Sequence, residues 1–322
     1  MIRVGENRPC DRSCFVILAC VVIIVNVTIE LQSITSDTTP YLAVAPRLFN
    51  ATKAQSDRSL KEVVRNGTKL NFSFKTLPEL IENLTSPVLL TTVNFGFTDF
   101  LHNLLFSIWR LRLQPNIVII CEDKESYVDI SRYQKSLNLR INLSMTHKDL
   151  SPTIALKYNT SEYGKLVNKR PRYVQMLINK GIDVFFIDTD IVLIGDPFPF
   201  FNGTSDVYVQ KELVNGTALC AGFFYMKSNS RTRKMVSDWI QYLDKHPTKM
   251  DQEGFNKLFA KGNFSISPLP PEQFSSGHVF MSSKTPWFER SPPLVEVHAN
   301  FIIGKDKKKE MLRNAGLWFV QY

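Results

Sequence analysis

The sequence predicts an α/β domain with a mostly parallel sheet flanked by helices, placed behind one N-terminal apolar segment. From residue 87 onward, apolar stretches of strand length alternate with longer stretches whose apolar residues recur at helical spacing. This alternation is typical of a parallel sheet with helices on both faces. The chain has 322 residues, 44% hydrophobic and 21% charged, so one large domain can bury a sizeable core.

The N-terminal apolar segment is predicted to be a transmembrane signal-anchor. Residues 14–29 carry no charged side chain, and three arginines precede them. The positive-inside rule then places residues 1–13 in the cytosol, residues 14–31 across the membrane and the rest of the chain in a lumen. A cleaved signal peptide is the alternative, because it shares the basic start and the apolar run. The lack of a small-x-small cleavage pattern favours the uncleaved anchor.

Residues 32–86 are expected to form a solvated lumenal stem, because they are polar and lack sustained periodicity, apart from a short helix near residues 77–84. Nine Asn-x-Ser/Thr triplets follow the apolar segment, which supports a secretory-pathway lumen. They begin at Asn50, Asn66, Asn71, Asn83, Asn142, Asn159, Asn202, Asn215 and Asn263. Residues 87–322 then form the lumenal domain.

Six alternating elements open this domain. Strands are expected at residues 87–94, 116–123 and 139–144, and helices at residues 97–113, 124–138 and 168–181. Gly181 is the expected C-cap of the third helix, and residues 183–194 follow as one long apolar strand. Cys121 and Cys220 lie in apolar strand-like runs and are expected to be buried thiols. Ligands of such sheets bind beyond the carboxyl ends of the strands.

Two aspartates interrupt the long strand, at Asp188 and Asp190 in the sequence VFFIDTDIVLI. Carboxylates inside apolar β sequence are costly to bury without a partner, and residues i and i+2 of a strand point the same way. Two like charges held close together favour a shared cation, and oxygen ligands suit Mg²⁺ or Mn²⁺. Such a metal can also bind the oxygens of a diphosphate. The alternative is a turn at the strand end with solvated aspartates.

Charge and missing motifs narrow the function classes. The net charge of +9 suits a phosphate-bearing ligand, a membrane surface or a nucleic acid, and surplus surface lysine explains it equally well. We expect no nucleic-acid partner, because zinc-finger spacing, a recognition helix and an aromatic RNA-binding signature are all missing from the sequence. The sequence also lacks the G-x-S-x-G elbow of serine hydrolases and the phosphosulfate-binding turn of sulfotransferases. A glycosidase would leave the Asp188–Asp190 strand unexplained.

Four ordered sequence blocks resemble the nucleotide-diphospho-sugar transferase domain of plant, algal and invertebrate Golgi proteins, which has a Rossmann-like glycosyltransferase-A fold. The blocks are FFIDTDIVLIGDPFPFF, CAGFFYMKSN, DQEGFN and VHANFIIGKDKKKEMLRNAGLW, and the resemblance covers about residues 87–322. It implies a retaining, manganese-dependent transferase that moves a sugar from uridine diphosphate (UDP) to a glycan or glycoprotein. It also implies a single-pass type II protein of the Golgi membrane with a lumenal catalytic domain.

The resemblance assigns roles to residues in these blocks. Asp188 and Asp190 are implied to bind the metal, and Asp188 also the nucleotide. His298, in VHANF, is implied to be the third metal ligand, although a lone histidine is otherwise more often a core residue. Lys305 is implied to contact the diphosphate. Residues 307–309 are expected to be the exposed start of a helix.

Two further pairs are candidates for the donor site. Thr92 and Asn94 end the first strand, where they are expected either to contact the nucleotide base or to make ordinary strand-end hydrogen bonds. Lys169 and Arg170 begin a helix whose first turn contains a proline, and they either reach the phosphates or stay solvated.

Asp251 and Gln252 open the DQEGFN block and are the candidate catalytic pair. The resemblance implies that they lie at the donor sugar, where a carboxylate or amide can stabilise developing positive charge. The alternative is an aspartate that caps the following helix. For the whole chain, the alternative function is a catalytically inactive, transferase-like protein that binds glycans or a partner in the Golgi lumen.

Overall fold

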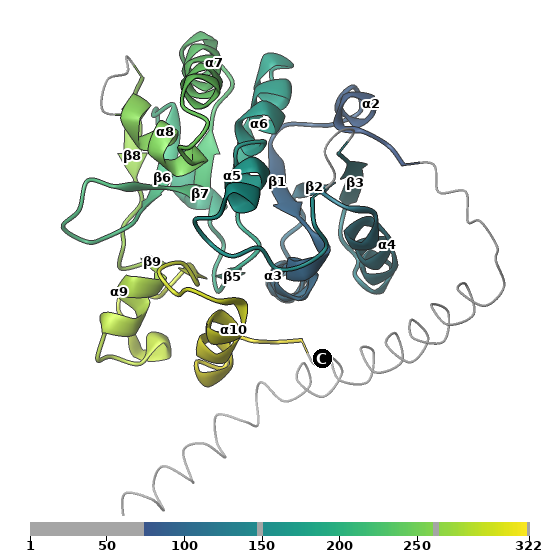
Figure 1. The fold of residues 1–322 in the computed structure, drawn as a ribbon. Helices are drawn as coiled ribbons and strands as arrows, with labels where there is room; N and C mark the ends of the chain where they lie inside the picture. Colours follow the sequence, from purple (N-terminus) through teal and green to yellow (C-terminus); the bar gives the residue numbers. More distant parts are fainter. Residues whose placement is uncertain (1–73, 147–150, 260–263, 321–322) are drawn as a thin grey trace, which may run out of the picture. The chain divides into compact units, whose positions relative to one another are not determined.

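The computed structural model describes residues 74–146, 151–259 and 264–320 (Figure 1). The predicted cytosolic tail, the signal-anchor of residues 14–31 and most of the predicted stem lie outside these residues. Within the described ranges, no helix combines the length and the apolar character needed to cross a membrane.

A seven-stranded sheet forms the centre of the described domain, in the order β3-β2-β1-β4-β7-β6-β8. Its strands are β1 (Val88–Val93), β2 (Asn116–Cys121), β3 (Ile141–Met145), β4 (Val184–Ile187), β6 (Val207–Lys211), β7 (Leu219–Met226) and β8 (Ile266–Pro268). Every neighbouring pair is parallel except the two that involve β7, which runs antiparallel to β4 and to β6. The predicted mostly parallel sheet is confirmed.

Helices connect the parallel strands, as the alternating sequence pattern predicted. The connecting helices are α3 (Thr98–Arg110), α4 (Lys124–Tyr133), α5 (Ser161–Val167) and α6 (Arg170–Asn179). The others are α2 (Leu77–Ile81), α7 (Ser230–Lys245), α8 (Asp251–Phe259), α9 (Gly277–Ser282) and α10 (Lys305–Asn314). Short 3-10 helices are η1 (Phe95–Phe97), η2 (Gln134–Ser136), η3 (Phe198–Phe201) and η4 (Trp287–Glu289). Helix α5 was not expected from the sequence.

Two predictions at the edges of these helices have clear outcomes. Gly181 follows α6 with φ at 82°, a left-handed conformation that suits glycine at a helix C-terminus, so the predicted cap is confirmed. The short helix predicted near residues 77–84 is α2. Its Leu77 and Ile81 join the main core, so this part of the predicted stem packs with the domain.

One face of the large sheet packs against α2, α6, α7 and α8. Alternate strand residues such as Val88 and Leu90 point to this face, where Trp239 of α7 and Phe255 of α8 are fully buried. Helices α3 and α4 lie on the other face, because their crossovers run the opposite way along the sheet. The two cysteines of the described residues are buried free thiols, as predicted.

A second sheet of three short strands, in the order β5-β10-β9, corrects one prediction. Its strands are β5 (Ile191–Leu193), β9 (Phe274–Ser276) and β10 (Glu296–His298). The single strand predicted over residues 183–194 is wrong, because the chain leaves the large sheet after β4, turns, and enters the small sheet as β5. The run is apolar on both sides of the turn because β4 and β5 are both completely buried, each in a different sheet.

The strand order reverses at β1, with β2 on one side and β4 on the other. Ligands of open α/β sheets bind outside the carboxyl ends of strands at such a switch point. Asn94 follows β1 and Asp188 follows β4, so the fold itself brings these two candidate residues to that edge.

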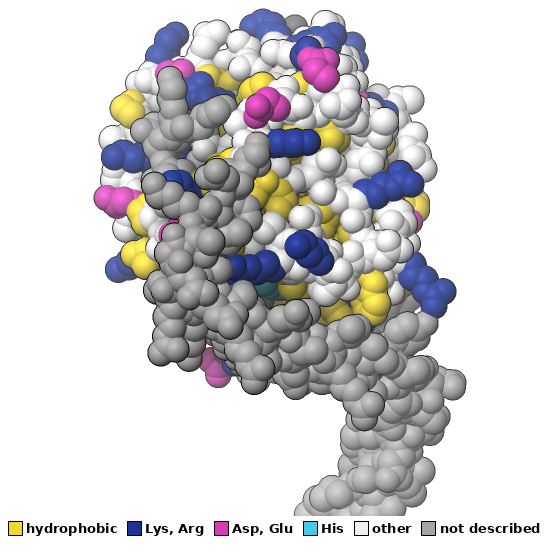
Figure 2. All heavy atoms as spheres, turned by 90° about the vertical axis from the view of Figure 1, so that its right-hand side faces the viewer, with side chains coloured by type: hydrophobic (Ala, Val, Ile, Leu, Met, Phe, Trp, Pro, Cys, Tyr) yellow, Lys and Arg dark blue, Asp and Glu magenta, His cyan; other side chains and the backbone are white. Residues whose placement is uncertain are grey.

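Surplus positive charge is dispersed over the face shown in Figure 2. Lys and Arg side chains lie there singly among uncharged polar and apolar atoms, with few acidic ones. On this face, the positive charge is therefore spread over separate solvated lysine and arginine side chains and does not form one basic patch.

Candidate active site

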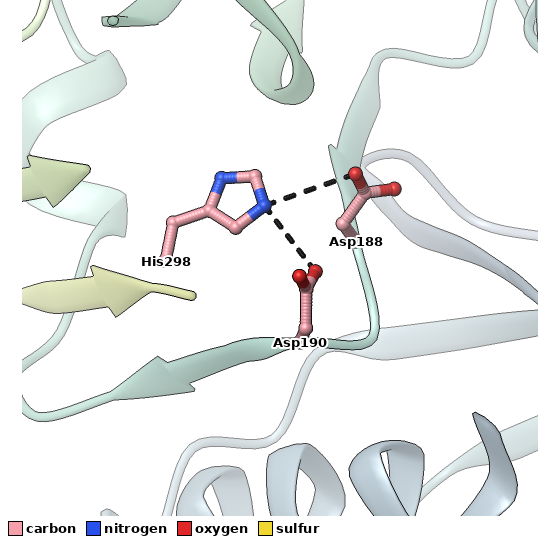
Figure 3. A group of neighbouring side chains, drawn as sticks. All are labelled: Asp188, Asp190 and His298. Carbon is pink, nitrogen blue, oxygen red and sulfur yellow. Dashed lines mark ion pairs between the residues drawn. The ribbon is translucent and has the colours of Figure 1, made fainter. Parts of the chain in front are cut away.

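Asp188, Asp190 and His298 form a compact acidic and imidazole cluster between the two sheets (Figure 3). His298 Nε2 lies 3.2 Å from Asp190 Oδ1 and 3.8 Å from Asp188 Oδ2. One ligand atom from each residue lies within 4.8 Å of the others. Asp190 and His298 are buried and Asp188 is half-buried. His298 thus meets two aspartates that lie more than 100 residues earlier in the sequence.

Backbone pairing fixes the positions of the three side chains. In the small sheet, β10 pairs with β5 so that His298 stands opposite Ile191, and the Ala299 amide donates to the Asp190 carbonyl at 3.0 Å. The Asp188 amide donates to the Gly222 carbonyl of β7 at 2.8 Å. The turn between β4 and β5 is therefore held from both sheets, and its two carboxylates face the imidazole.

Gly222 provides the space for this arrangement. A Cβ atom at this position would lie 2.2 Å from Asp188 Oδ2, closer than real Cβ contacts allow, and 3.0 Å from His298 Cε1, which is tighter than most such contacts. Glycine on a strand interior is otherwise unfavourable, and it is found where another group must approach the backbone closely. The sequence CAGFFYM does not predict that the Asp188 side chain lies against Gly222.

Two cations balance the charge of the aspartates. Arg170 Nη2 lies 2.9 Å from Asp188 Oδ1, and the Lys308 ammonium contacts Asp190 Oδ2. Burial and the neighbouring Asp190 charge raise the pKa of Asp188, against the opposing effect of Arg170. Burial alone would also raise the pKa of Asp190, but Lys308 and His298 together bring it well below its ordinary value. The two carboxyls thus titrate apart, as expected for close like charges with different partners.

Asp251 joins this network through Arg170, whose Nη1 lies 3.3 Å from Asp251 Oδ2. The guanidinium therefore bridges two carboxylates, which outweigh its burial and raise its pKa. Burial raises the pKa of Asp251 to about 6, with Arg170 opposing the shift. The alternative N-cap role does not describe it, because Asp251 is the first helical residue of α8, with its side chain buried and directed to Arg170.

Gln252, the second predicted catalytic residue, is anchored between β6 and β7. Its Oε1 accepts from the Ala221 amide at 3.2 Å, and its Nε2 donates to Glu212 Oε1 at 3.3 Å. Ala221 immediately precedes Gly222, so Gln252 lies beside the strand that supports the cluster.

Asn94 and Thr92 occupy the end of β1, as expected. The Asn94 side chain is buried and its Nδ2 donates to the carbonyls of Pro152 and Ile154, both at 2.7 Å. The strand-end hydrogen bonds of the alternative interpretation are therefore present for Asn94, and they hold the segment after residue 151 against the edge of the sheet. Thr92 is half-buried one residue before the end of β1.

Two of the predicted lysines contact different carboxylates. Lys169 Nζ lies 2.9 Å from the completely buried Glu122, so at this helix start it is Arg170 that reaches the cluster. Lys305 Nζ lies 2.9 Å from Asp99 Oδ1.

The expectation that residues 307–309 are merely an exposed helix start is wrong for two of them. Lys308 contacts Asp190 and Lys309 lies 3.2 Å from Asp99, while Lys307 is exposed. Residues i, i+3 and i+4 share one face of a helix, so the spacing of Lys305, Lys308 and Lys309 was the available signal.

The donor set fits a divalent cation. Two carboxylates and one imidazole offer oxygen and nitrogen ligands, which suit Mn²⁺ and Mg²⁺. Lys308 and Arg170 stand beside the same carboxylates, where they can face the oxygens of an anionic ligand such as a diphosphate.

A sequence profile of the nucleotide-diphospho-sugar transferase family matches residues 112–312. The chain belongs to this family. The match covers the Asp188–Asp190 turn, His298 and all five lysines discussed above, so the family profile includes the residues of the site.

Relatives of this transferase carry named activities. The UDP-D-xylose:L-fucose alpha-1,3-D-xylosyltransferase 3 of Arabidopsis thaliana is 24% identical over 259 residues, covering 72% of this chain and 66% of the relative. The UDP-galactose:fucoside alpha-3-galactosyltransferase of Dictyostelium discoideum is 25% identical over 279 residues, covering 70% of this chain and 42% of the relative. The chain therefore spans about two thirds of the first relative and less than half of the second.

A solved structure agrees on the fold. The glycosyltransferase GlyE of Streptococcus pneumoniae superposes with a TM-score of 0.50 at 13% identity, covering 74% of this chain and 61% of that chain. At this identity the likeness concerns the fold alone, and it supports the glycosyltransferase-A type α/β fold predicted from the sequence.

Gly222→Ala should disrupt the cluster without unfolding the domain. The new Cβ displaces the Asp188 carboxylate, so we expect Mn²⁺ affinity, measured by titration calorimetry, to fall about 10-fold or more. Gly195→Ala is the matched control, because a Cβ there meets its nearest atom at an ordinary 3.5 Å. Equal Mn²⁺ affinity in both variants and the wild type would contradict the prediction that Asp188 binds a metal.

Proposed function

We propose that this transferase is a metal-dependent glycosyltransferase that moves a sugar from a UDP-sugar to a glycan or glycoprotein. The observation that carries the proposal is the convergence of Asp188, Asp190 and His298 from two sheets at the switch-point edge of the larger one. Two carboxylates and an imidazole that point into one space form a ligand set that suits a divalent cation, beyond the charge that Arg170 and Lys308 already balance. Membership of the nucleotide-diphospho-sugar transferase family supplies the ligand class.

Asp188, Asp190 and His298 are the residues proposed to hold Mn²⁺ or Mg²⁺. When bound, such an ion neutralises the charge that develops on the departing diphosphate. The chain contributes cations of its own: Lys308 and Lys305 lie on one face of α10, next to Asp190 and Asp99. Both ammonium groups can turn from these carboxylates to phosphate oxygens when the donor binds, which is the diphosphate role predicted for Lys305.

Arg170 and Asp251 are proposed to position the donor sugar. Arg170 is fixed between Asp188 and Asp251, so a sugar hydroxyl beside it meets an oriented donor and an oriented acceptor of hydrogen bonds. The ionised Asp251 carboxylate favours positive charge on the sugar ring as the bond to the diphosphate breaks. Thr92 and Asn94, at the end of β1, and Lys169 are proposed to lie toward the nucleoside end of the same donor.

The acceptor is proposed to be a fucose-terminated glycan. The names of the two relatives differ in the donor sugar but share a fucose or fucoside acceptor, position 3 and an alpha linkage. Xylose and galactose are α-linked in their UDP donors, so an alpha product corresponds to retention of configuration, as the resemblance implied. In a retaining reaction on one face of the sugar, the leaving phosphate can accept the proton of the acceptor hydroxyl.

Phe301 is the residue proposed to line the acceptor side. It lies three residues after His298, is 53% exposed and has φ at 60°, a conformation that a bulky residue rarely adopts. The preceding residue holds it there, because Asn300 Oδ1 accepts from the Gly277 amide at 2.7 Å. An exposed aromatic ring only three residues from His298 suits the apolar face of a sugar.

The cellular setting is part of the proposal. Residues 14–31 are proposed to anchor a single-pass type II protein in the Golgi membrane, with the catalytic domain in the lumen. Exposed asparagines of the predicted triplets, at Asn83, Asn159, Asn202 and Asn215, are available for glycosylation, whereas Asn142 lies in β3, paired with Val118 of β2.

One observation favours the inactive glycan-binding alternative. Arg170 and Lys308 already balance the charges of Asp188 and Asp190, so the cluster is neutralised without a metal. A protein that bound glycans without catalysis could keep this arrangement.

The test is UDP release by the purified full-length protein from a panel of UDP-sugars, with and without Mn²⁺ and with a fucoside acceptor. The proposal predicts Mn²⁺-dependent UDP release that one donor and the fucoside together accelerate. Glycan binding without UDP release from any donor, and without Mn²⁺-dependent nucleotide binding, would favour the inactive alternative.

The pKa of Asp251 gives a second prediction. Because the folded-state pKa is raised to about 6, the carboxylate is protonated below that pH, and kcat/KM should rise with pH through about 6. Asp251→Asn should lower kcat about 100-fold and abolish this pH limb. Glu253→Gln is the control, since Glu253 lies on the same helix but is exposed and pairs with Lys249. An unchanged pH limb in Asp251→Asn would remove Asp251 from the reaction.

A further inference from the structure

The imidazole of His298 is held on the side away from the aspartates by Gln210 of β6. His298 Nδ1 lies 3.0 Å from Gln210 Oε1, while Nε2 faces Asp188 and Asp190. Gln210 is completely buried, although an amide side chain is costly to bury unless its polar atoms have partners.

Glu296 provides the other partner of this amide. Gln210 Nε2 donates to Glu296 Oε1, and Glu296 is also completely buried. Glu296 and His298 are two residues apart on β10, so their side chains emerge on the same face of the small sheet. The three side chains form a chain of hydrogen bonds from Glu296 through Gln210 to His298.

The direction of this chain determines which nitrogen of His298 carries a proton. An amide nitrogen can only donate and an amide oxygen can only accept. With Nε2 of Gln210 committed to Glu296, its Oε1 must accept from His298 Nδ1, which is therefore an N–H donor. In the neutral ring the lone pair is then on Nε2, the nitrogen that faces the two carboxylates.

A backbone irregularity places Gln210 for this contact. The ladder between β6 and β7 shifts register between Val209 and Lys211, so Gln210 stands opposite the β7 segment that contains Cys220 and Gly222. Such irregularities re-aim side chains and occur next to active sites. Here the same shift brings the Gln210 amide, the Gly222 space and the Cys220 thiol against one imidazole.

We propose that Gln210 is a positioning residue that fixes the tautomer and the ring orientation of His298, so that a bare Nε2 faces a divalent cation. Glu296 in turn fixes Gln210. This inference rests on the proposed metal site. It adds Gln210 and Glu296, which act behind His298 and do not contact the Asp188 and Asp190 carboxylates. Partners of this kind behind a ligating histidine raise metal affinity, and their loss typically lowers it 10- to 100-fold.

The first test is Mn²⁺ binding by full-length variants, measured by the loss of the free-Mn²⁺ signal in electron paramagnetic resonance. Gln210→Met keeps the volume of the side chain but removes the acceptor for Nδ1, so we expect 10- to 100-fold weaker Mn²⁺ binding. Cys220→Ala is the matched control, because Cys220 Sγ is the other group near Nδ1, at 3.5 Å, and is a poor acceptor. Its Mn²⁺ affinity should stay within about twofold of the wild type.

The second test reads the tautomer directly and needs only the wild type. Long-range ¹H–¹⁵N spectra of ¹⁵N-histidine-labelled protein with Mg²⁺ and UDP should show His298 with a proton on Nδ1 and none on Nε2. A proton on Nε2 would overturn the proposal, even if Gln210→Met fails to fold. Wild-type affinity for Mn²⁺ in a folded Gln210→Met variant would overturn it as well.

The two proposals fail in different ways. Absence of Mn²⁺ binding by the wild type would count against the proposed function. Tight Mn²⁺ binding by both the wild type and Gln210→Met would count only against the role of Gln210.

Discussion

The site depends on one constraint: two close carboxylates, one buried and one half-buried, lie beside a buried imidazole, and their charges must be compensated. Asp188 and Asp190 lie at a turn that carries the chain from the large sheet to the small one, and His298 closes the space from β10. The pairing of β10 with β5 and of the Asp188 amide with β7 sets this geometry before any ligand binds. An arrangement built in advance in this way loses little free energy to reorganisation when a cation arrives.

The surrounding residues serve the same constraint. The charge of Asp188 is balanced by Arg170, and that of Asp190 by Lys308. Both cations can form ion pairs with the phosphates of a donor when it binds. Gly222 leaves room for the Asp188 carboxylate. Gln210 accepts a hydrogen bond from His298 Nδ1, so the proton of the neutral imidazole lies on Nδ1 and not on Nε2. Burial raises the pKa of Asp251, the proposed catalytic carboxylate, while Arg170 lowers it and Asp188 raises it further. The protonation of Asp251 therefore depends on the same charged residues as the cluster.

The sequence predicted what local patterns determine. Apolar runs of strand length and helical periodicity located β1 to β3 and the helices between them, because each element buries an apolar face of its own. The sequence also predicts the three central residues of the site. Carboxylates in apolar β sequence indicate a partner for Asp188 and Asp190, and the resemblance of the surrounding blocks to a known family indicates His298. The structure brings all three together.

The sequence could not predict features that long-range pairing decides. The break between β4 and β5 is hidden because both strands are buried, and the turn follows from pairing with a strand about 100 residues later. Arg170 contacts Asp188, whereas Lys169 contacts Glu122. Which of the two faces the cluster depends on how α6 is rotated about its axis, and two adjacent cations in a sequence do not determine that rotation. Gln210 looks like one polar residue in an alternating strand, and only the register shift of β6 against β7 turns it to His298.

Anomalous diffraction from crystals grown with Mn²⁺ and UDP would locate a metal in this site directly. We expect an anomalous peak within about 2.5 Å of the Asp188 and Asp190 carboxylates and of His298 Nε2, beside the diphosphate. UDP bound in the site with no manganese peak among these three residues, or with the peak elsewhere, would contradict it.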